Sequence, residues 1–528
     1  MSKILNGIEA LEKLKNGAEK LTECVKITLG PKGKNAALDK QYTTPLITND
    51  GVTIAREITL DCPFENMGAS IIKEASIRAN EQAGDGTTTA CLLSSSIIKE
   101  GFKNISAGVN PILLRVGIEK ATKEVVQKLK EISKPIESQE EIIQVASIAS
   151  GNQNIGEIIG QAIEMVGRDG IISIEESSTN QTYITKSSGY EYDRGYASPY
   201  MVTNTTKMTA ELNSPLILVI NKKISTLNEI LPVLEQVVQT GRELLIIADD
   251  VENELLATLV LNRVNGNLPV TVTKAPAFAE KRRQTLEDIA TLTGATLVSN
   301  ETGISMQSIT IGDLGSAKSV TISKDKTTII DGNGDKNKLN DLIESLRNQL
   351  NLTDDPYTKD NIKTRLAKLT SGVAVIHAGA SSEVEIKELK MRIEDALSAT
   401  KSASEEGIVA GGGSTLLHIS NNLKNYPATI KNQEEQLGAK ILLTAIREPI
   451  KQIAINSGAN PGEVEYVVSQ KNDPSWGYDA LKNEFKDLIE SGIIDPAKVT
   501  RCALENASSV AATLLTTSSL ISNTHEEK

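Results

Sequence analysis

A chain of 528 residues has room for three or four domains, and with 39% hydrophobic but only 3% aromatic residues its cores must be aliphatic. Its net charge of −12 argues against a nucleic-acid-binding protein, since such proteins usually present a basic face. Four scattered cysteines without a CxxC pair, and only three histidines, predict reduced thiols and no zinc site. The first residues carry both charge signs, unlike a signal peptide. No apolar run approaches the roughly 18 residues of a membrane span, which favours a cytoplasmic protein.

Residues 1 to about 130 have the pattern of helices separated by glycine-containing breaks. The first breaks come at residues 30–31 and 50–51. A helical apolar spacing then predicts a helix that ends at Gly84, and the same spacing resumes a few residues later. The stretch AGDGTTTACLL, residues 83–93, is therefore predicted to be a corner between two helices.

From Gly189 the pattern changes to short apolar runs that alternate with helices. That alternation is the sequence form of βαβ units around a mostly parallel sheet. A long charged helix follows and the rest of the chain is again helical, so the α/β part is predicted to be inserted into a helical body. The predicted strands are residues 214–220, 243–250 and 268–275, and the predicted helices are residues 230–241, 254–266, 282–295 and 382–406.

The helix corner at residues 83–93 has the composition of a phosphate site, although the chain contains neither GxxxxGK[ST] nor a GxGxxG that opens a βα unit. A helix N-terminus supplies free backbone N–H groups, and glycines let a ligand approach the backbone. Asp85 between two glycines could hold a magnesium ion that bridges phosphates. The alternative is an Asp-Gly turn with Thr87 as the helix N-cap, which accounts for one of the three threonines.

Two further glycine-bearing helix corners raise the case for a nucleotide pocket. TLGPKGKN, residues 28–35, ends a helix in a Gly-Pro break with two lysines, although a plain helix stop explains it as well. VAGGGSTLL, residues 409–417, places three glycines before a helix, where either a ligand or tight packing requires close approach. Together the three corners predict one assembled site.

Ten short motifs stand in the order expected of a group I chaperonin, the bacterial and organellar type, and this resemblance runs from about residue 3 to 522. It implies an α+β multidomain fold. The mostly helical equatorial ATP-binding domain would be residues 1–131 and 406–528, the small intermediate hinge domain 132–188 and 374–405, and the inserted α/β apical domain 189–373. The motifs are TLGPKG, NDGVTIAREI, ENMGA, AGDGTTTA, RGYASPY, LLIIADDVE, ATLTGA, EDALSAT, EEGIVAGGG and DPAKVTR.

The resemblance also implies an ATPase with ATP, Mg²⁺ and K⁺ as cofactors. Asp85 would hold the magnesium ion, Asp395 would orient the attacking water, and Asp50 would stand beside the γ-phosphate. Taken without the resemblance, the sequence around Asp395 predicts only a solvated face of a charged helix. The implied nucleotide-binding residues are Thr28, Leu29, Gly30, Pro31, Asp85, Gly86, Thr87, Thr88, Thr89, Gly412, Asp479, Ala480, Leu481 and Asp495.

The predicted helices 229–240 and 254–264 are apolar over more than the stripe of roughly 100° that covers a sheet. The surplus is either buried against another surface or exposed for binding, because exposed apolar patches recognise unfolded chains. The resemblance implies the second. The implied residues of the client and co-chaperonin surface are Tyr196, Tyr200, Met201, Leu231, Leu234, Leu256, Val260 and Leu261.

The function implied by the resemblance is an ATP-driven foldase. It would capture unfolded polypeptides and encapsulate them in a seven-membered ring, single or double, closed by a small co-chaperonin in the bacterial cytoplasm. The chain departs from the family pattern at Asn49, Ala149, Asp479 and Leu481. These departures leave open a divergent paralogue that has weak ATPase activity and acts as an interaction scaffold. A metabolic α/β enzyme is disfavoured, because the βα units present no phosphate-binding glycines, no His-Cys cluster and no paired acids.

Overall fold

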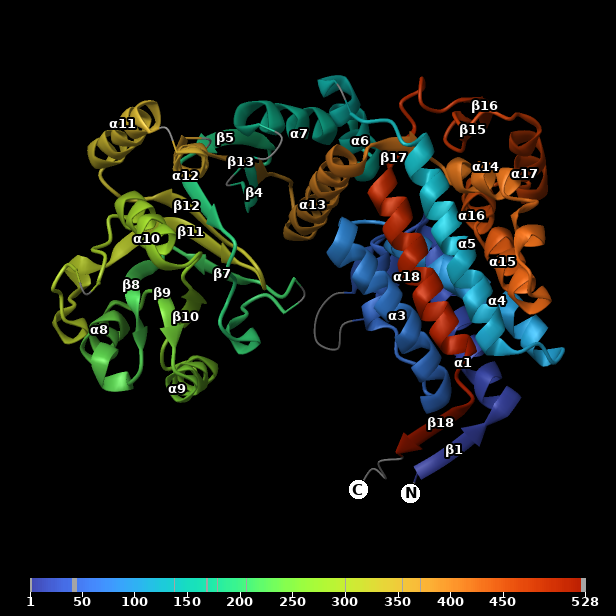
Figure 1. The fold of residues 1–528 in the computed structure, drawn as a ribbon, viewed down its shortest axis with the longest axis horizontal. Coiled ribbons are helices and arrows are strands. Elements are labelled where there is room, and N and C mark those ends of the chain that lie inside the picture. The colour runs from blue at the N-terminus through green and yellow to red at the C-terminus, as the bar shows by residue number, and fades with distance from the viewer. Residues whose placement is uncertain are drawn as a thin grey trace. The chain divides into compact units, whose positions relative to one another are not determined.

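The chain forms two compact units, each with its own core (Figure 1). Unit 1 comprises residues 1–161, 178–180 and 378–528, and unit 2 comprises residues 162–177 and 181–377, so unit 2 is inserted into unit 1 along the chain. The finer division into three domains stays a prediction. The computed structural model describes residues 2–39, 45–136, 138–167, 170–177, 179–205, 207–299, 301–353, 355–370 and 372–523.

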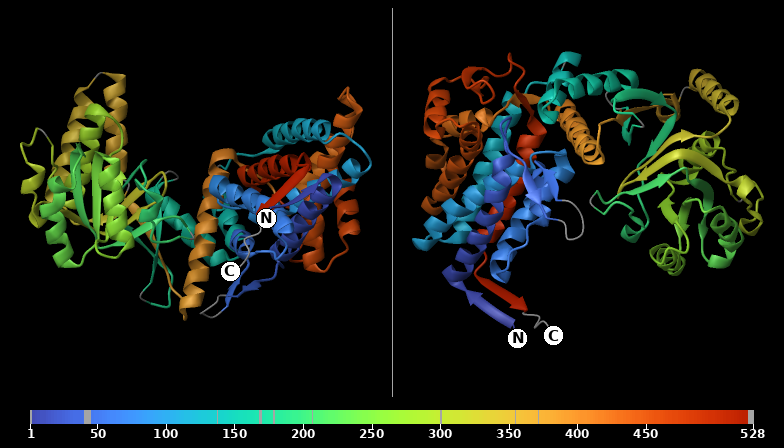
Figure 2. Two further views of the ribbon diagram at one scale, coloured as in Figure 1. Left: turned by 90° about the horizontal axis from the view of Figure 1, so that it is seen from below. Right: turned by 180° about the vertical axis from the view of Figure 1, so that it is seen from behind.

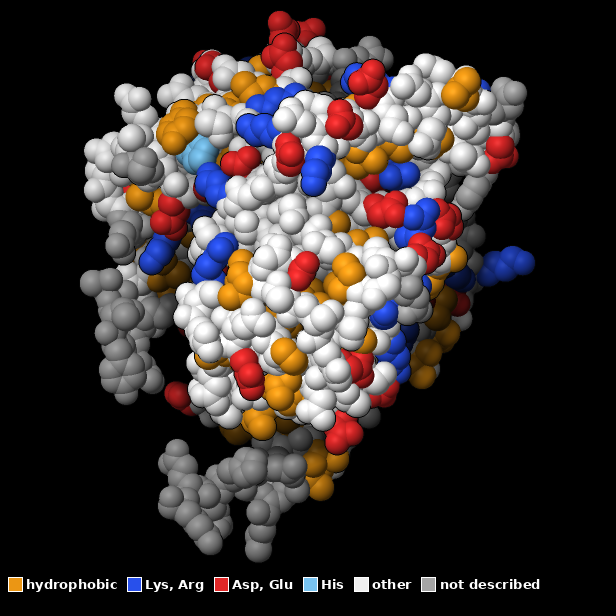
Figure 3. Space-filling model, turned by 90° about the vertical axis from the view of Figure 1, so that its left-hand side faces the viewer, with side chains coloured by type: hydrophobic (Ala, Val, Ile, Leu, Met, Phe, Trp, Pro, Cys, Tyr) orange, Lys and Arg blue, Asp and Glu red, His pale blue; other side chains and the backbone are white. Residues whose placement is uncertain are grey.

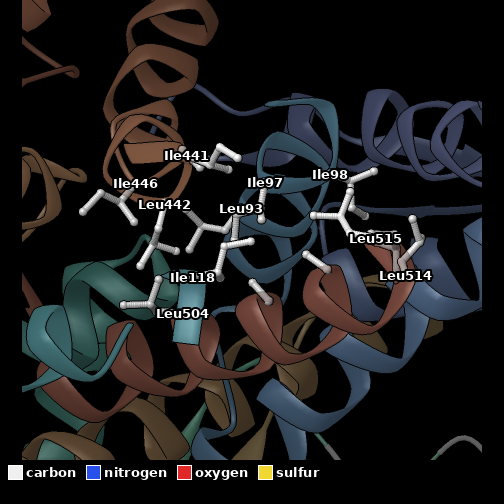
Figure 4. Packing of buried hydrophobic residues seen from close by; sticks show 14 of the residues in the cluster. Leu93, Ile97, Ile98, Ile118, Ile441, Leu442, Ile446, Leu504, Leu514 and Leu515 are labelled. Carbon is white, nitrogen blue, oxygen red and sulfur yellow. The ribbon is translucent and has the colours of Figure 1, made fainter. Parts of the chain in front are cut away.

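Unit 1 is a helical body around an aliphatic core. Long helices from both ends of the chain pack together, with α18 against α3, α4 and α5, and α15 against α5. Figure 4 shows leucine and isoleucine side chains from these helices meeting in the core, among them Leu93, Ile118 and Leu504, which are fully buried. The principal helices are α1 (Gly7–Val25), α3 (Pro63–Ala83), α4 (Thr87–Ser106), α5 (Pro111–Ile132), α15 (Gln433–Ala445) and α18 (Ala497–Leu515).

The remaining elements of unit 1 are the long helix α13, several shorter helices and two-stranded ribbons. In one ribbon β1 pairs antiparallel with β18, so that segments from opposite ends of the chain lie side by side (Figures 1 and 2). The helices are α2 (Gly51–Glu57), α6 (Gln139–Ser150), α13 (Glu383–Glu406), α14 (Ser414–Asn422), α16 (Glu448–Ser457) and α17 (Pro461–Gln470), while α7 (Gln153–Val166) crosses the chain boundary between the units. The ribbons are β1 (Ser2–Asn6) with β18 (Ser519–Asn523), β2 (Ala36–Leu38) with β3 (Leu46–Thr48), β14 (Ile408–Ala410) with β17 (Ile494–Pro496), and β15 (Trp476–Asp479) with β16 (Glu484–Asp487).

Unit 2, green to yellow in Figure 1, is built on a seven-stranded sheet. Its path is β10 (Val270–Lys274), β9 (Leu244–Val251), β8 (Leu216–Ile224), β11 (Gly315–Ile322), β12 (Thr327–Gly332) and β6 (Gly189–Tyr192), with β7 (Ala210–Asn213) also paired to β11. A three-stranded sheet has the order β4 (Ile171–Glu176), β13 (Val373–Ala378) and β5 (Tyr183–Ser187). The helices are α8 (Leu227–Thr240), α9 (Asn253–Val264), α10 (Ala279–Thr293), α11 (Lys336–Leu352) and α12 (Pro356–Thr370).

The three predicted βα repeats are confirmed, because β8, β9 and β10 are parallel neighbours that alternate with α8 and α9 and lead into α10. The prediction of a mostly parallel sheet is wrong. β11, β12, β6 and β7 all pair antiparallel. The reason is local: only residues 323–326 connect β11 to β12, which is too short for a parallel crossover and forms a tight turn closed by the Ser323 N–H donating to Lys326 O.

Within the described part of the chain, no helix combines the length and the apolarity that crossing a membrane requires.

Candidate functional site

The corner between α3 and α4 is built around two left-handed glycines. Gly84 caps the end of α3 with φ 71°, and Gly86 caps the start of α4 with φ 82°, leaving the half-buried Asp85 between them. A Cβ at Gly84 would lie 2.1 Å from Ser398 Cβ, and one at Gly86 would lie 2.9 Å from Val499 Cγ1. Neither position therefore accepts a side chain, and the helix corner predicted from the sequence is confirmed. Thr87 is the first residue of α4 and not its N-cap, so the simple capping explanation of this threonine is wrong.

The corner at residues 28–31 lies against the same threonines. A short 3₁₀ turn (Lys26–Thr28) ends α1, and its Thr28 Oγ1 lies 3.2 Å from Thr88 Oγ1. Gly30 follows with φ 85°, and a Cβ there would meet the Ile453 side chain at 3.2 Å. Two predicted corners, far apart in sequence, therefore meet at the N-terminus of α4.

Asp50 lies beside this corner as the N-cap of α2. Its carboxylate accepts from the N–H of Val52 at 3.2 Å and of Thr53 at 2.9 Å. The next residue, Gly51, is pressed against α4, because a Cβ there would lie 2.3 Å from Thr88 Oγ1. The pairing of a capping acid with glycine thus lets the start of α2 approach the start of α4.

The negative charges of Asp50, Asp85 and Asp495 influence one another in pairs at these corners. Burial raises the pKa of Asp85, and the negative charge of Asp50 raises it further, against the lowering effect of the Gly86 N–H. Burial, with a contribution from the charge of Asp85, raises the pKa of Asp495 to about 7. Asp495 stands on β17, where a Cβ at Gly411 would lie 3.1 Å from its Oδ1. The site therefore concentrates negative charge that a cation would relieve.

The donors suit a magnesium ion shared with a phosphate ligand. Carboxylate oxygens are what Mg²⁺ prefers, and it commonly takes one or two of them together with substrate phosphates. Among the residues that the structure describes, no three acidic, histidine or cysteine side chains are grouped so as to hold a metal ion alone. A divalent ion beside Asp85 would thus depend on oxygen atoms from its ligand.

The raised pKa of Asp495 predicts a pH-dependent stability. The unfolded chain loses this proton near pH 4, whereas the folded protein keeps it to about pH 7, so the stabilising contribution is complete at low pH and is lost as the pH rises through 7. Asp495→Asn cannot ionise. In calorimetry of the nucleotide-free protein, it should raise the melting temperature more at about pH 8 than at about pH 5. An equal difference at both pH values would contradict the assignment.

The predicted base side of the site is a second glycine corner facing the hairpin β15–β16. Gly412 has φ 64°, and a Cβ there would lie 3.6 Å from Tyr478 O. In the hairpin Ala480 is buried, whereas Leu481 is 60% exposed. An exposed leucine on this hairpin can lose apolar surface to a ligand that packs on it, which would favour binding.

Asp479 does not add an uncompensated negative charge to the base side of the site. It is buried, its Oδ2 lies 2.5 Å from Lys486 Nζ, and its Oδ1 accepts from the N–H of Leu481 and of Lys482. Burial alone would raise the pKa of Asp479, but Lys486 and the two N–H donors outweigh it and hold the pKa below its usual value. Asp479, at which the chain departs from the family pattern, therefore has its negative charge offset by Lys486 of the same hairpin.

Asp395 stands on α13, which packs against the α3–α4 corner. Ser402 Oγ donates to Ala83 O at 2.9 Å, and Ser398 occupies the space that a Cβ at Gly84 would need. Asp395 precedes Ser398 by three residues and so shares its helix face. The sequence alone predicted a solvated surface for this helix, whereas Ile393, Ala396 and the serine face are packed into unit 1.

The predicted client surface lies in unit 2 and is only partly exposed. Tyr200 is 74% exposed, Leu261 61% and Leu231 37%, while Tyr196, Leu256 and Val260 are partly buried. Val238 and Val264, which were not predicted, are 50% and 64% exposed. Figure 3 shows hydrophobic side chains on the lower part of this face, where Figure 1 places α8 and α9. We call the five exposed residues the α8–α9 patch; they are Tyr200, Leu231, Val238, Leu261 and Val264.

Met201 and Leu234 do not belong to that patch. Met201 is fully buried with its sulfur accepting from the Val272 N–H, and Leu234 is 4% exposed in the core between α8 and the sheet. The prediction that these two side chains line a binding surface is wrong in this structure. Leu234 lies on the side of α8 that covers the sheet, and Met201 ends a 3₁₀ turn (Pro199–Met201) and packs its side chain on β10.

Several contacts that shape the site escaped sequence reasoning. Asn456 of α16 donates to two carbonyls of the 26–29 turn, and Lys32 donates to Asn483 of the β15–β16 hairpin. Lys486 neutralises Asp479. Only Lys32 stands in one of the ten family motifs, TLGPKG, and the partners of all three residues are distant in sequence or depend on hairpin register, so no sequence signal pointed to these contacts.

A helical body with hydroxyl, glycine and carboxylate groups gathered at one helix N-terminus defines a nucleotide-binding class of protein. The inserted α/β unit adds a separate exposed apolar patch. Residues 21–525 match the TCP-1/cpn60 chaperonin family, and the chain belongs to that family. Its members are ATPases that bind ATP with Mg²⁺, bind unfolded polypeptides and form oligomeric rings. Membership thus implies ATP-dependent protein folding.

Proposed function

We propose that this protein is an ATP-driven chaperonin of the group I type. It captures unfolded polypeptides on the α8–α9 patch and encapsulates them in a seven-membered ring closed by a small co-chaperonin. One observation carries the proposal: Thr28, Asp50 and Asp495 come together at the α3–α4 corner. A folding chamber needs both such an energy-consuming site and an apolar capture surface, and this chain has both.

The nucleotide would lie along the start of α4. The N–H groups and threonine hydroxyls of residues 87–89, with the turn at residues 28–31, would bind the phosphates, helped by the positive end of the helix. Residues 412 and 479–481 would bind the base and ribose side. When bound at Asp85, Mg²⁺ would supply positive charge that offsets the charge of the phosphates and of the nearby carboxylates.

Two carboxylates would have separate roles in ATP hydrolysis. Asp395 would accept a hydrogen bond from the attacking water and orient it, and Asp50 would hold the start of α2 beside the terminal phosphate. K⁺ is proposed as a further cation at the phosphates. The alternative of a divergent paralogue with weak ATPase activity rested partly on the departure at Asp479. The pairing of Asp479 with Lys486 removes that support.

Small two-stranded ribbons with exposed isoleucines support the proposal of a ring. The β1–β18 ribbon has only two strands, a form that is marginal in water without further partners. Ile4 and Ile521 on this ribbon are 58% and 61% exposed, and Ile47 on β3 is 54% exposed. The four cysteines are free thiols, which fits a reducing compartment. We propose the bacterial cytoplasm as that compartment. We further propose the equatorial, intermediate and apical domain boundaries given above.

Phosphate release from ATP tests the function directly. The protein should hydrolyse ATP with Mg²⁺ and K⁺, and an unfolded client should refold only when ATP and a co-chaperonin are present. Asp85→Asn should lose Mg²⁺-dependent ATP binding, because it removes the one proposed protein ligand of the metal. Glu81→Gln, an exposed carboxylate near the end of α3, serves as the control that leaves binding unchanged. A protein without Mg²⁺-dependent turnover would refute the proposal.

A further inference from the structure

The last turn of α16 clamps the phosphate-side corner of the site through one amide. Asn456 Nδ2 donates to Lys26 O at 2.9 Å and to Leu29 O at 2.8 Å. The Oδ1 atom of the same amide accepts from Gln452 Nε2 at 2.8 Å, which fixes the amide so that its nitrogen faces the two carbonyls. Carbonyls at the end of a helix lack partners within the helix, so an external donor determines how that end is shaped.

The same turn of α16 also reaches the base side. Ser457 Oγ lies 3.3 Å from the hydroxyl of Tyr478, and that hydroxyl donates to Asn483 Oδ1 at 2.8 Å. Asn483 Oδ1 also accepts from Lys32 Nζ at 3.2 Å, which returns the chain of contacts to the corner at residues 28–33. A closed loop of hydrogen bonds therefore joins the phosphate corner, α16 and the β15–β16 hairpin.

Helix α16 supports the corner by packing as well. Ile453, three residues before Asn456 and so on the same helix face, fills the space beside Gly30. The corner itself is short and has a glycine in the left-handed region, so it has little intrinsic preference for one conformation. Its geometry depends on what holds it: the buried Ile453 supplies the apolar part of that support, and the half-buried amide of Asn456 supplies the polar part.

We propose that Asn456 is a positioning residue for nucleotide binding, which holds the 28–31 corner in the conformation that receives the ligand and joins it to the base-side hairpin through α16. This inference rests on the proposed function. Asn456 makes its hydrogen bonds to Gln452, Lys26 and Leu29, none of which has a proposed part in the chemical step. Its loss should therefore weaken ATP binding while leaving the chemical step nearly unchanged.

Two substitutions test the role by the separation of KM from kcat. In Asn456→Asp the two carbonyls face an acceptor in place of a donor. In Asn456→Ala, Leu29 O loses this donor and Lys26 O keeps the N–H of Leu29 at 3.3 Å. Both should raise the KM for Mg-ATP about tenfold with kcat within about threefold, corresponding to the loss of one or two hydrogen bonds. Hydrogen exchange should be faster in the peptide covering residues 26–34. Asn460→Asp is the matched control, because Asn460 is an exposed N-cap that uses only its Oδ1 acceptor, which aspartate retains.

The outcomes separate the inference from the function on which it rests. A wild-type protein that hydrolyses ATP, with both Asn456 variants at wild-type KM, overturns the positioning role and leaves the proposed function standing. A fall in kcat at unchanged KM also overturns it. If Asn456→Asp fails to fold, the alanine variant and its exchange pattern decide. A wild-type protein that neither binds nor hydrolyses ATP overturns both proposals.

Discussion

Replacing Asp395 by alanine should slow ATP hydrolysis at least about 100-fold, a loss of about 2.7 kcal/mol of barrier lowering, while ATP still binds. The reason is that α13 carries Asp395 on the face that packs at the α3–α4 corner, and a carboxylate there can orient water without contributing to the binding of phosphate. Single-turnover hydrolysis with radiolabelled ATP, together with equilibrium binding of ATP, measures the two effects separately.

Glu388→Ala is the matched control for that experiment. It removes the same charge from the same helix, but Glu388 is paired with Arg392 on the helix surface. Its hydrolysis rate should stay within about twofold of wild type, as expected for an exposed pair. Near-normal turnover by Asp395→Ala would remove this residue from the mechanism, and equal losses in both variants would mean that the charge of α13 matters more than the position of Asp395.

The double substitution Leu261→Ser and Val264→Ser should abolish stable capture of an unfolded client while ATP hydrolysis continues. These side chains are 61% and 64% exposed on the last turns of α9. Burying each against a client would contribute about 1.5–3 kcal/mol, so losing both should weaken capture at least 100-fold. Co-sedimentation of a denatured, labelled client with the chaperonin measures the effect.

Leu352→Ser and Leu234→Ser separate capture from folding. Leu352 is 85% exposed on α11, outside the α8–α9 patch, so its replacement should leave capture unchanged. Leu234 is buried between α8 and the sheet, so Leu234→Ser should destabilise unit 2 and expose it to protease. Normal capture by the double variant on α9 would show that clients bind elsewhere.

The fold was predictable wherever one local pattern determines an element. Two glycines bracket a corner at Gly84 and Gly86, and alternating apolar runs mark β8, α8, β9 and α9. The orientation of β11 and β12 was not predictable from the βα repeats that precede them, because it depends on a four-residue turn and on pairing with β6 and β7, which come much earlier in the chain.

The site was predictable as a set of residue types but not as a set of contacts. Glycine-bearing helix corners pointed to residues 28 and 85, the family resemblance added Asp50, and the structure brings these together. Whether an apolar residue faces the sheet or the solvent depends on the rotation of its helix; the resemblance placed Leu234 on the binding surface, whereas in this structure Leu234 faces the sheet. Asn456 was missed because an amide that binds backbone carbonyls leaves no pattern in the sequence.

Helix α18 is synthesised near the end of the chain, although the helices that it covers are synthesised near the beginning. It completes the core of unit 1 by packing on α3, α4 and α5, yet it begins at Ala497 while α5 ends at Ile132. At about 5–20 residues per second, a ribosome would leave those helices without their partner for roughly 20–75 s. Unit 2, whose strands all lie in between, can fold in that interval. A growing copy of this chaperonin thus exposes the kind of apolar surface that its finished ring binds, which makes it a candidate client of the rings already assembled.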